Sequence, residues 1–474
     1  MSVATALLGL ALGAGSAQDA AQPPNIVLIV TDDQGYRDLG CYGAVGFATP
    51  HLDNLASQGL RATSAYVSQA TCTSSRASIL TGCYANRVGV EGALMPWSKV
   101  GLNPDEDTIA ELLSERGYRT RFIGKWHLGH QPEHRPTRHG FDHWFGLPYS
   151  NDMWPVDYDG NLVEGEHRKT KYPPLPLYDD DEVVAELTSL TQQDTLTQRY
   201  TRRAVAFIEE AAPAGPFYLQ LMHSMPHVPL GASAEFKGKS ETYYGDVIQE
   251  IDASTGEVLA ALERAGVTER TLVVFTSDNG PWLNYGDHAG SALPLKEGKG
   301  TMWEGGCRVP FLVRFPGVIP PGSTSDELMA TIDLLPTFVE LAGARAPRLP
   351  IDGTSLLAHW RAPDSPSPRT EYAYYYNGAL HAVRQGRWKL HVPHAYRSYE
   401  RLMPGSGGHP GKTATGRVGF ALFDLEADPG ERRDVADKQP EVVENLMALA
   451  ERTRAELGDG ERRGSGEREP ARSK

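Results

Sequence analysis

The sequence predicts an α/β fold with a large, mostly parallel sheet sandwiched by helices, plus a small C-terminal antiparallel sheet with one helix. Three observations lead to this prediction. Apolar runs alternate with amphipathic stretches along most of the chain, as in parallel strands joined by helices. Four of the apolar runs end directly at polar, reactive residues. Beyond residue 370, several short strand-like segments precede one long amphipathic stretch.

Continuous apolar runs predict the buried strands of the large sheet, because strands covered on both faces lack polar alternation. The runs span residues 25–30, 120–123, 217–222 and 272–275. Polar groups follow them, in order Thr31-Asp32-Asp33, Gly124-Lys125-Trp126-His127, His223 and Thr276-Ser277-Asp278-Asn279. Parallel sheets bind ligands beyond the carboxyl ends of their strands. We therefore expect these polar groups to meet at one edge of the sheet.

Helical spacing of apolar residues lies between the predicted strands. A helix over residues 108–116 is expected to be capped by Asp107 and ended by Gly117. Similar spacing predicts helices over residues 203–212 and 251–265. Because these helices connect strands, we expect them to cover the faces of the sheet.

A Pro- and Ser-rich run over residues 361–369 separates the two predicted parts of the chain. Segments beyond it predict the small sheet (371–376, 382–384, 388–392 and 421–425) and its helix (440–457). The expected organisation is an export signal (1–22), a large α/β domain (23–362), a small subdomain (370–457) and a disordered tail rich in Gly, Glu and Arg (458–474).

The composition limits the partners of the protein. The chain has 474 residues and a formal net charge of −14, which does not favour nucleic acid or an anionic membrane. A polyanionic substrate would therefore need a local group of cations. Residues 1–17 are small and apolar, which indicates export to the periplasm or the medium, although a disordered N-terminus has the same composition. No later stretch is apolar enough to span a bilayer. Four cysteines do not make a disulfide scaffold.

Two strand ends predict a metal site. Asp32-Asp33 and Asp278-Asn279 together supply three carboxylates and one amide. Capping of a helix or turn would explain either pair alone. Adjacent carboxylates repel each other unless a cation neutralises them, and the second pair follows an equivalent strand. Oxygen ligands of this kind suit Ca²⁺ or Mg²⁺.

Three loops carry side chains suited to an anionic ligand. Lys125 and His127 lie in a glycine-bounded loop, where both can face one anionic group. Prolines on both sides of His227 restrict the loop that orients its imidazole. Glycines around Lys299 would let this lysine approach a ligand closely. Each loop alone is better explained as a solvated loop, so the prediction depends on their combination.

Cys72 lies in the most informative segment, residues 68–82. Hydroxyl residues and Arg76 follow it, and then a short apolar helical run. Ser74 or Ser75 is the expected cap of this helix, whose free N–H groups and dipole favour an anion. Taken alone, Cys72 would be interpreted as a small buried apolar residue.

Taken in order, these segments resemble the sulfatase family over nearly the whole chain. The matching blocks are residues 49–53, 68–82, 124–129, 139–152, 244–246 and 423–431. The resemblance implies an alkaline-phosphatase-like fold in which residues 23–362 form the catalytic domain. Sulfatases usually carry proline two residues after the cysteine, where this chain has Ser74.

The resemblance also implies a cofactor and a role for each site residue. A formylglycine-generating maturation enzyme would oxidise Cys72 to formylglycine, an aldehyde whose hydrate is the nucleophile. Ca²⁺, with Mg²⁺ as the other choice, would be held by Asp32, Asp33, Asp278, Asn279 and the modified Cys72. The remaining implied roles are to steady the hydrate (Arg76), to bind sulfate oxygens (Lys125 and Lys299), to protonate the leaving oxygen (His227) and to take a proton from the hydrate (His127).

The expected function is hydrolysis of a sulfate ester of a sugar or an aryl group by an exported enzyme. Two alternatives stay open. If Ser74 impaired recognition by the maturation enzyme, the protein would be a catalytically silent binder of sulfated glycans. A hydrolase of phosphate or phosphonate esters could use the same scaffold. Candidate walls of the substrate pocket are Tyr149, Asn151, Asp152, His288 and Trp303.

Overall fold

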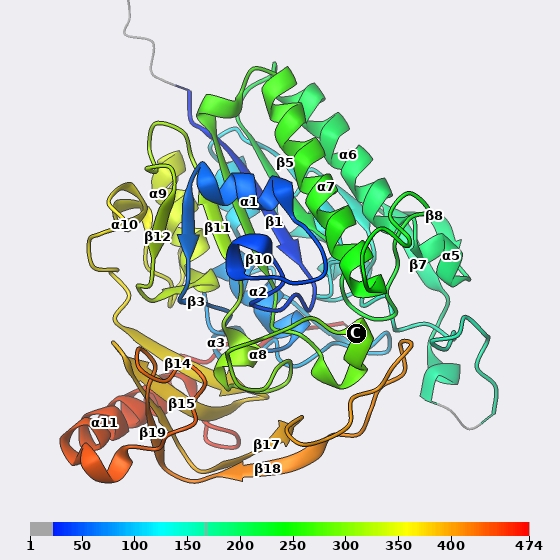
Figure 1. Cartoon of the computed structure of the whole chain (residues 1–474). Coiled ribbons are helices and arrows are strands. Elements are labelled where there is room, and N and C mark those ends of the chain that lie inside the picture. The colour runs from blue at the N-terminus through cyan, green and yellow to red at the C-terminus, as the bar shows by residue number, and fades with distance from the viewer. Residues whose placement is uncertain (1–21, 166–167, 474) are drawn as a thin grey trace, which may run out of the picture.

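The computed structural model describes residues 22–165 and 168–473 and has the predicted α/β architecture (Figure 1). Among these residues, ten strands form the large sheet in the order β12-β2-β11-β10-β1-β9-β5-β6-β7-β8. The five central strands run parallel, and they are β10 (Thr271–Ser277), β1 (Asn25–Thr31), β9 (Phe217–Met222), β5 (Arg119–Gly124) and β6 (His143–Gly146). The predicted fold class, a mostly parallel sheet covered by helices, is confirmed.

Antiparallel pairing extends the sheet at both edges. The outer strands are β11 (Phe311–Arg314), β2 (Leu60–Ala62) and β12 (Ser323–Ser325) beside β10, and β7 (Leu175–Asp179) and β8 (Glu182–Leu187) beside β6. β12 alone of these runs parallel to its neighbour β2. The carboxyl ends of β10, β1, β9 and β5 consequently lie together at one edge.

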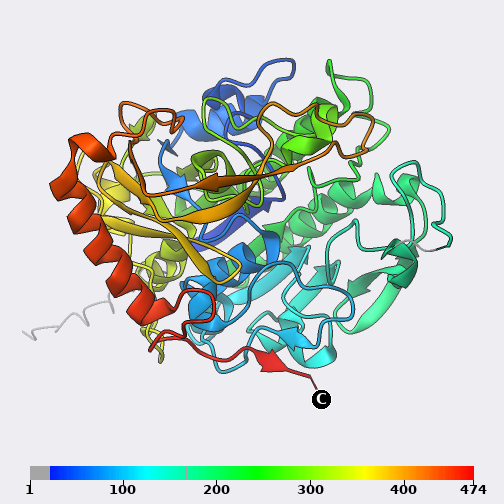
Figure 2. The same ribbon diagram turned by 90° about the horizontal axis from the view of Figure 1, so that it is seen from below.

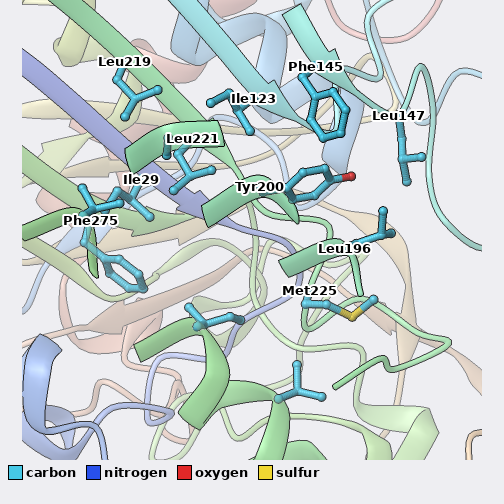
Figure 3. Close-up of a cluster of buried hydrophobic side chains, with 14 of the residues drawn as sticks. Ile29, Ile123, Phe145, Leu147, Leu196, Tyr200, Leu219, Leu221, Met225 and Phe275 are labelled. Atoms are coloured by element: carbon cyan, nitrogen blue, oxygen red, sulfur yellow. The ribbon is translucent and has the colours of Figure 1, made fainter. Parts of the chain in front are cut away.

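One face of the sheet is covered by α1 (Pro50–Ser57), α6 (Leu196–Ala211) and α7 (Tyr243–Arg264). Val27 and Ile29 of β1 point into this layer, because alternate residues of a strand face opposite sides. Figure 3 shows Ile29 beside Phe275 and Leu221, with Tyr200 of α6 nearby. Complete burial of such a side chain contributes about 1.5–3 kcal/mol.

The opposite face is covered by α2 (Cys72–Thr81), α4 (Ile109–Ser114) and α9 (Leu334–Ala342). Ile26, Leu28 and Val30 of β1 are fully buried against this second layer. Because β1 is buried on both faces, it reads in the sequence as a continuous apolar run. Shorter elements of the same unit are β3 (Ala65–Tyr66), α3 (Ala85–Val88), β4 (Val100–Gly101), α5 (Leu190–Gln193), α8 (Glu304–Cys307), β13 (Met329–Ala330) and α10 (Leu357–Arg361).

Helix α4 begins one residue later than predicted, and its cap is Thr108. The Thr108 hydroxyl accepts a hydrogen bond from the Glu111 N–H at 3.2 Å, and the Glu111 carboxylate accepts one from the Thr108 N–H at 2.8 Å. This reciprocal pair is a capping box. The prediction that Asp107 is the cap is wrong, because its carboxylate pairs with Arg345 at 2.9 Å instead.

The small C-terminal sheet matches its prediction closely. Its four antiparallel strands are β14 (Glu371–Tyr376), β15 (Ala379–Gln385), β16 (Trp388–His391) and β19 (Ala421–Asp424). The helix α11 (Pro440–Leu457) packs its apolar side chains, among them Leu446 and Ala450, against this sheet. A separate hairpin of β17 (His394–Ser398) and β18 (Ala414–Val418) extends from it, as Figures 1 and 2 show.

The predicted disordered tail is instead ordered. Strand β20 (Ala471–Arg472) pairs with β4, so the chain ends beside the large domain (Figure 2). Arg468 forms an ion pair with the buried Glu106 at 2.6 Å. The prediction of disorder is wrong because composition shows many charges but not the opposite charges that they meet in the fold.

The remaining expectations concern export, membranes and thiols. The predicted export signal, residues 1–22, lies outside the described residues except for Gln22. Within the described part of the chain, every helix is too short or too polar to cross a membrane. The four cysteines all lie in this part, and each is a free thiol.

Candidate active site

The strand ends place the predicted acidic residues in one buried cluster. Asp32 and Asp33 follow β1, and Asp278 and Asn279 follow the neighbouring parallel strand β10. The N–H of Asp33 donates a hydrogen bond to Asp278 Oδ1 at 3.2 Å, and Asn279 Nδ2 donates to Asp33 Oδ1 at 2.7 Å. Asp33 has a φ of +68°, which is uncommon for a residue other than glycine. The two predicted pairs therefore form a single unit.

Cys72 is the first residue of α2, and its side chain faces this acidic cluster. Its Sγ lies 3.4 Å from Asp32 Oδ1 and 3.3 Å from Lys299 Nζ. Thr71 occupies the cap position of α2, so the prediction that Ser74 or Ser75 caps this helix is wrong. The Ser74 hydroxyl instead accepts a hydrogen bond from the Gly92 N–H at 2.7 Å. Ser74 thereby fastens a neighbouring loop to the helix that carries Cys72.

The cluster fits a divalent cation. One potential ligand atom from each of Asp32, Asp33, Cys72 and His227 lies within 4.8 Å of the others. Asp33 Oδ2 and Asn279 Oδ1 are buried without any hydrogen-bond partner. Because they lie beside these converging ligand atoms, the two free oxygens support binding of a cation here. Carboxylate and amide oxygens are ligands of hard cations such as Ca²⁺ and Mg²⁺.

Three cationic side chains face the three carboxylates. Lys125 contacts the Asp32 carboxylate and donates to Ser150 Oγ at 3.2 Å. Lys299 Nζ lies 2.6 Å from Asp33 Oδ1. Arg76 contacts two carboxylates, Asp278 Oδ2 at 2.9 Å and Asp32 Oδ2 at 3.3 Å. It also donates a hydrogen bond to the Lys125 carbonyl at 2.6 Å. The sequence-predicted cations therefore all reach the acidic cluster.

Burial and neighbouring charges shift the pKa values of Asp32, Asp278 and Cys72 by different amounts. Burial alone would raise the pKa of Asp32, but Lys125 and Arg76 hold this pKa far below its usual range. Burial and the charge of Asp32 raise the pKa of Asp278 to about 6. Burial also raises the pKa of the Cys72 thiol, with Asp32 adding to the effect. An unmodified Cys72 is therefore a neutral thiol near pH 7, and a neutral thiol is a weak nucleophile.

His227 presents its Nε2 atom to the cluster. This atom lies 3.6 Å from Asp33 Oδ2, while Nδ1 donates to the Val228 carbonyl at 2.6 Å. Asn151 holds the loop by donating to the carbonyls of His227 at 3.3 Å and Pro229 at 3.1 Å. Burial lowers the pKa of His227, and the nearby Lys299 adds to the decrease. Nε2 can therefore exchange a proton with a group bound beside Asp33.

His127 lies beside the first turn of α2, where its carbonyl accepts from the Thr73 hydroxyl at 2.9 Å. Its Nε2 is 2.9 Å from the Leu94 carbonyl, so Nε2 carries the proton in the neutral ring. Nδ1 is buried without a hydrogen-bond partner. Burial and the charge of Lys125 lower the pKa of His127 well below its usual value. Nδ1 is thus an unoccupied proton acceptor.

Two further residues belong to the site but are not assigned roles by the sequence. Ser150 lies between Lys125 and His227, with its Oγ 3.5 Å from His227 Nε2. The Trp282 ring lies 5.5 Å from the His227 ring and 4.6 Å from Lys299 Nζ. Both follow strand ends of the sheet, β6 and β10, and that position is the signal that could have identified them.

Two of the residues predicted to line the substrate pocket, Asn151 and Trp303, lie in different parts of the fold. Asn151 supports the His227 loop, as described above. Trp303 is buried and stacks on His391 of the small sheet, with 4.2 Å between ring centroids. The expectation that Trp303 lines the pocket is therefore wrong.

Known proteins resemble this chain over nearly its whole length. Residues 24–344 match the family described as Sulfatase. Residues 298–392 match the family described as N-sulphoglucosamine sulphohydrolase, C-terminal, and residues 367–468 match the C-terminal region of aryl-sulfatase.

Individual relatives agree with these matches. The chain is 38% identical to arylsulfatase A of Homo sapiens over 464 residues, which cover 93% of this chain and 89% of the relative. It is 36% identical to N-acetylgalactosamine-6-sulfatase of Canis lupus familiaris over 474 residues, with coverage of 94% and 87%. The crystal structure of the PsFucS1 sulfatase from Pseudoalteromonas sp. superposes with a TM-score of 0.82 at 30% identity, covering 91% of this chain and 90% of that chain.

Proposed function

Because this chain belongs to the sulfatase family of sulfuric ester hydrolases, we propose that it cleaves sulfate esters of sugars or aryl groups through a formylglycine made from Cys72. The observation that carries the proposal is the position of Cys72 Sγ, 3.4 Å from Asp32 and 3.3 Å from Lys299. The names of its relatives, arylsulfatase A and N-acetylgalactosamine-6-sulfatase, support an aryl sulfate or a sulfated amino sugar as substrate.

Ca²⁺ is the proposed metal, with Mg²⁺ as the other choice. Its ligands would be Asp32, Asp33, Asp278, Asn279 and the modified Cys72. The unpaired oxygens of Asp33 and Asn279 support this set. A bound cation would supply positive charge next to the sulfate and the nucleophile. Ca²⁺ accepts several carboxylate and amide oxygens in flexible geometry, whereas Mg²⁺ usually keeps several waters.

The reaction consumes one water for each ester and yields an alcohol and sulfate. Once Cys72 is converted, its aldehyde hydrate would provide one hydroxyl as the nucleophile toward sulfur and a second that lets sulfate leave. Lys125 and Lys299 would hold the sulfate oxygens and stabilise the charge that develops on them. Arg76 would fix the carboxylates and the hydrate in position.

Two imidazoles are proposed to move protons. His227 Nε2 would donate a proton to the departing oxygen, because it faces the site while Nδ1 is engaged with the Val228 carbonyl. His127 Nδ1 would accept a proton from the hydrate, because it is buried and unpaired. General acid or base help of this kind contributes about 10²–10⁴-fold to the rate.

The proposal includes export and a maturation partner. The small apolar N-terminal residues support export to the periplasm or the medium. A formylglycine-generating enzyme would act on residues 68–82. The serine that replaces the usual proline has a hydrogen bond of its own with Gly92, which supports a role for Ser74 in the folded protein.

Mass spectrometry of the peptide that contains Cys72 tests the proposal directly. Protein from a host that contains a formylglycine-generating enzyme is expected to show the aldehyde and to release sulfate from nitrocatechol sulfate. Cys72→Ala should release none while its circular dichroism spectrum is unchanged. An unmodified thiol together with no sulfate release would contradict the enzyme function and favour a glycan-binding protein. Faster turnover of aryl phosphonates than of aryl sulfates would favour the alternative function, hydrolysis of phosphate or phosphonate esters.

A further inference from the structure

The β17–β18 hairpin is fastened to the loop that carries Lys299. Glu297, which is 4% exposed, accepts hydrogen bonds from the Ser398 hydroxyl at 2.6 Å and from the Tyr399 N–H at 2.8 Å. The Tyr399 hydroxyl donates to the Lys299 carbonyl at 2.5 Å. Figure 1 shows the hairpin below the carboxyl-end loops of the large sheet. The C-terminal part of the chain thus contributes directly to the surroundings of an active-site lysine.

Arg397 lies on β17 and reaches the same loop. A methyl group added to Gly300 would lie 3.1 Å from Arg397 Nη1 and 3.2 Å from the Tyr376 hydroxyl. The Arg397 charge also acts on Tyr399 and Tyr285. Because residue 300 has no side chain, the guanidinium can come close to the backbone beside Lys299.

Aromatic rings connect this position with the proton donor. Tyr285 packs edge-on against Trp282, with 4.9 Å between ring centroids. Trp282 in turn lies 5.5 Å from the His227 ring. A substrate held at Lys299 and His227 would therefore have aromatic surface between its sulfate and Arg397.

Arg397 differs from the other cations of the site in having no carboxylate partner among the described residues. Arg76, Lys125 and Lys299 each contact a carboxylate of the acidic cluster. Arg397 is half-buried and, in the part of the chain that the structure describes, forms no ion pair with a carboxylate. The nearby Glu297 carboxylate is engaged by the Ser398 hydroxyl and the Tyr399 N–H instead. A half-buried guanidinium without a counterion is stabilised by an external anion.

We propose that Arg397 binds a second anionic group of the substrate, a sulfate or a carboxylate that lies beyond the scissile sulfate. This inference rests on the proposed function. A guanidinium can bind either oxyanion with two parallel hydrogen bonds. The favoured substrate is accordingly a sulfated sugar with more than one negative charge, because a simple aryl sulfate offers Arg397 no second anion.

Substrate pairs that differ by one anionic group test the proposal. The probes are N-acetylgalactosamine monosulfate and disulfate, and a monosulfated disaccharide with and without a uronic acid carboxylate. Arg397→Gln is expected to lower the preference for the doubly charged member, measured as a ratio of kcat/KM values, by about 10- to 100-fold. Arg397→Lys should keep part of the preference, because it keeps the charge but loses the planar fork. The pair that is affected more identifies the anion as sulfate or carboxylate.

Arg417 on β18 provides a matched control, because its side chain is exposed on the same hairpin. Arg417→Gln should leave the preference as it is in the parent protein. A second measurement does not depend on turnover. Titration of N-acetylgalactosamine disulfate into the Cys72→Ala protein should show weaker binding when Arg397→Gln is added, by a similar factor.

Equal losses of kcat/KM on both members of each pair would overturn the proposal, and so would disulfate binding that Arg397→Gln leaves unchanged. Failure of the proposed function gives a different result. In that case the parent protein with converted Cys72 would release sulfate from no probe, and the titration alone would decide the role of Arg397.

Discussion

Two buried clusters of opposite charges differ in one respect, namely whether their side-chain oxygen atoms are all paired. The active-site cluster contains Asp32, Asp33 and Asp278 with three cations. The junction cluster lies between α8 and the small sheet and contains Glu304, Lys389, Glu431 and His391. Side chains of all these residues are almost completely buried.

Every carboxylate oxygen of the junction cluster has a partner. Glu304 accepts from the hydroxyls of Tyr66 at 2.5 Å and Tyr374 at 3.1 Å and pairs with Lys389 at 3.1 Å. Glu431 pairs with Lys389 at 2.8 Å and accepts from the Glu304 N–H at 2.7 Å. In the active-site cluster, by contrast, an oxygen of Asp33 and one of Asn279 are unpaired. Burial and charge alone therefore do not identify a ligand site, whereas unpaired oxygens beside converging ligand atoms support one.

Removal of the proposed metal should give the largest difference between the clusters. Exhaustive chelation of the matured protein is expected to abolish sulfate release and to lower the Tm, and added Ca²⁺ should restore both. At a hundredfold excess over Kd, a ligand stabilises the folded state by about 2.7 kcal/mol. Asn279→Ala, which removes an unpaired oxygen, should weaken the effect of Ca²⁺ on the Tm. Full turnover after chelation would show that the site needs no metal.

Lys389→Met should have the second largest effect, on stability. The change leaves two buried carboxylates without their shared cation, and breaking a buried ion pair costs about 3–5 kcal/mol. The free energy of unfolding, measured by denaturant titration, should decrease by this amount. The exposed Lys438→Met serves as the control and should stay within about 0.5 kcal/mol of the parent. A loss as small as that of the control would show that the pairing contributes little to folding.

Two buried histidines sharpen the comparison further. His227→Ala should slow esters with alkyl leaving groups about tenfold or more beyond activated aryl esters, because protonation matters most for a basic departing oxygen. His391→Ala, which removes a partner of Glu431 at 2.9 Å, should instead lower the Tm and leave this ratio of rates unchanged. Equal slowing of both ester types by His227→Ala would indicate that His227 positions the substrate.

Glu431 should produce the smallest effect, a change in pH dependence. Burial raises the pKa of Glu431 to about 7 from its ordinary 4.5, with Lys389 opposing part of the increase. Between these values the folded protein binds more protons than the unfolded chain, so stability falls as pH rises through this window. Glu431→Gln removes this contribution. Its free energy of unfolding should therefore improve relative to the parent between pH 5 and 8, and parallel curves would contradict the assignment.

The central sheet could be predicted from the sequence because both of its faces are buried. Strand β9 has the predicted bounds, and β1, β5 and β10 differ from theirs by one or two residues. Helix α7 begins at Tyr243 rather than at residue 251, because Thr242 caps it by accepting from the Gly245 N–H at 3.0 Å. The prediction missed this first part although it contains Val247 and Ile248, which are buried in the core.

The proximity of the site residues could be predicted, because parallel strands end at the same edge of a sheet. Contacts between segments that are distant in the sequence could not be predicted in this way. Asp32 and Asp278 come from adjacent strands and could be combined. Glu304 and Lys389 each look like a surface residue in the sequence, and only the docking of the small sheet pairs them. Arg397 was likewise not predicted, because its place beside Gly300 depends on how the β17–β18 hairpin packs on the Lys299 loop.

The position of β1 in the sheet has a consequence for the order of events during synthesis. Its neighbours β9 and β10 come much later in the chain, and Lys299 follows Cys72 by more than 200 residues. At about 5–20 residues per second, roughly 10–45 s pass between the synthesis of Cys72 and that of Lys299. Helix α2, which is buried along its whole length in the finished fold, lacks its covering during this interval. The chain order would thus give the proposed maturation enzyme a period of access that ends when the sheet is complete.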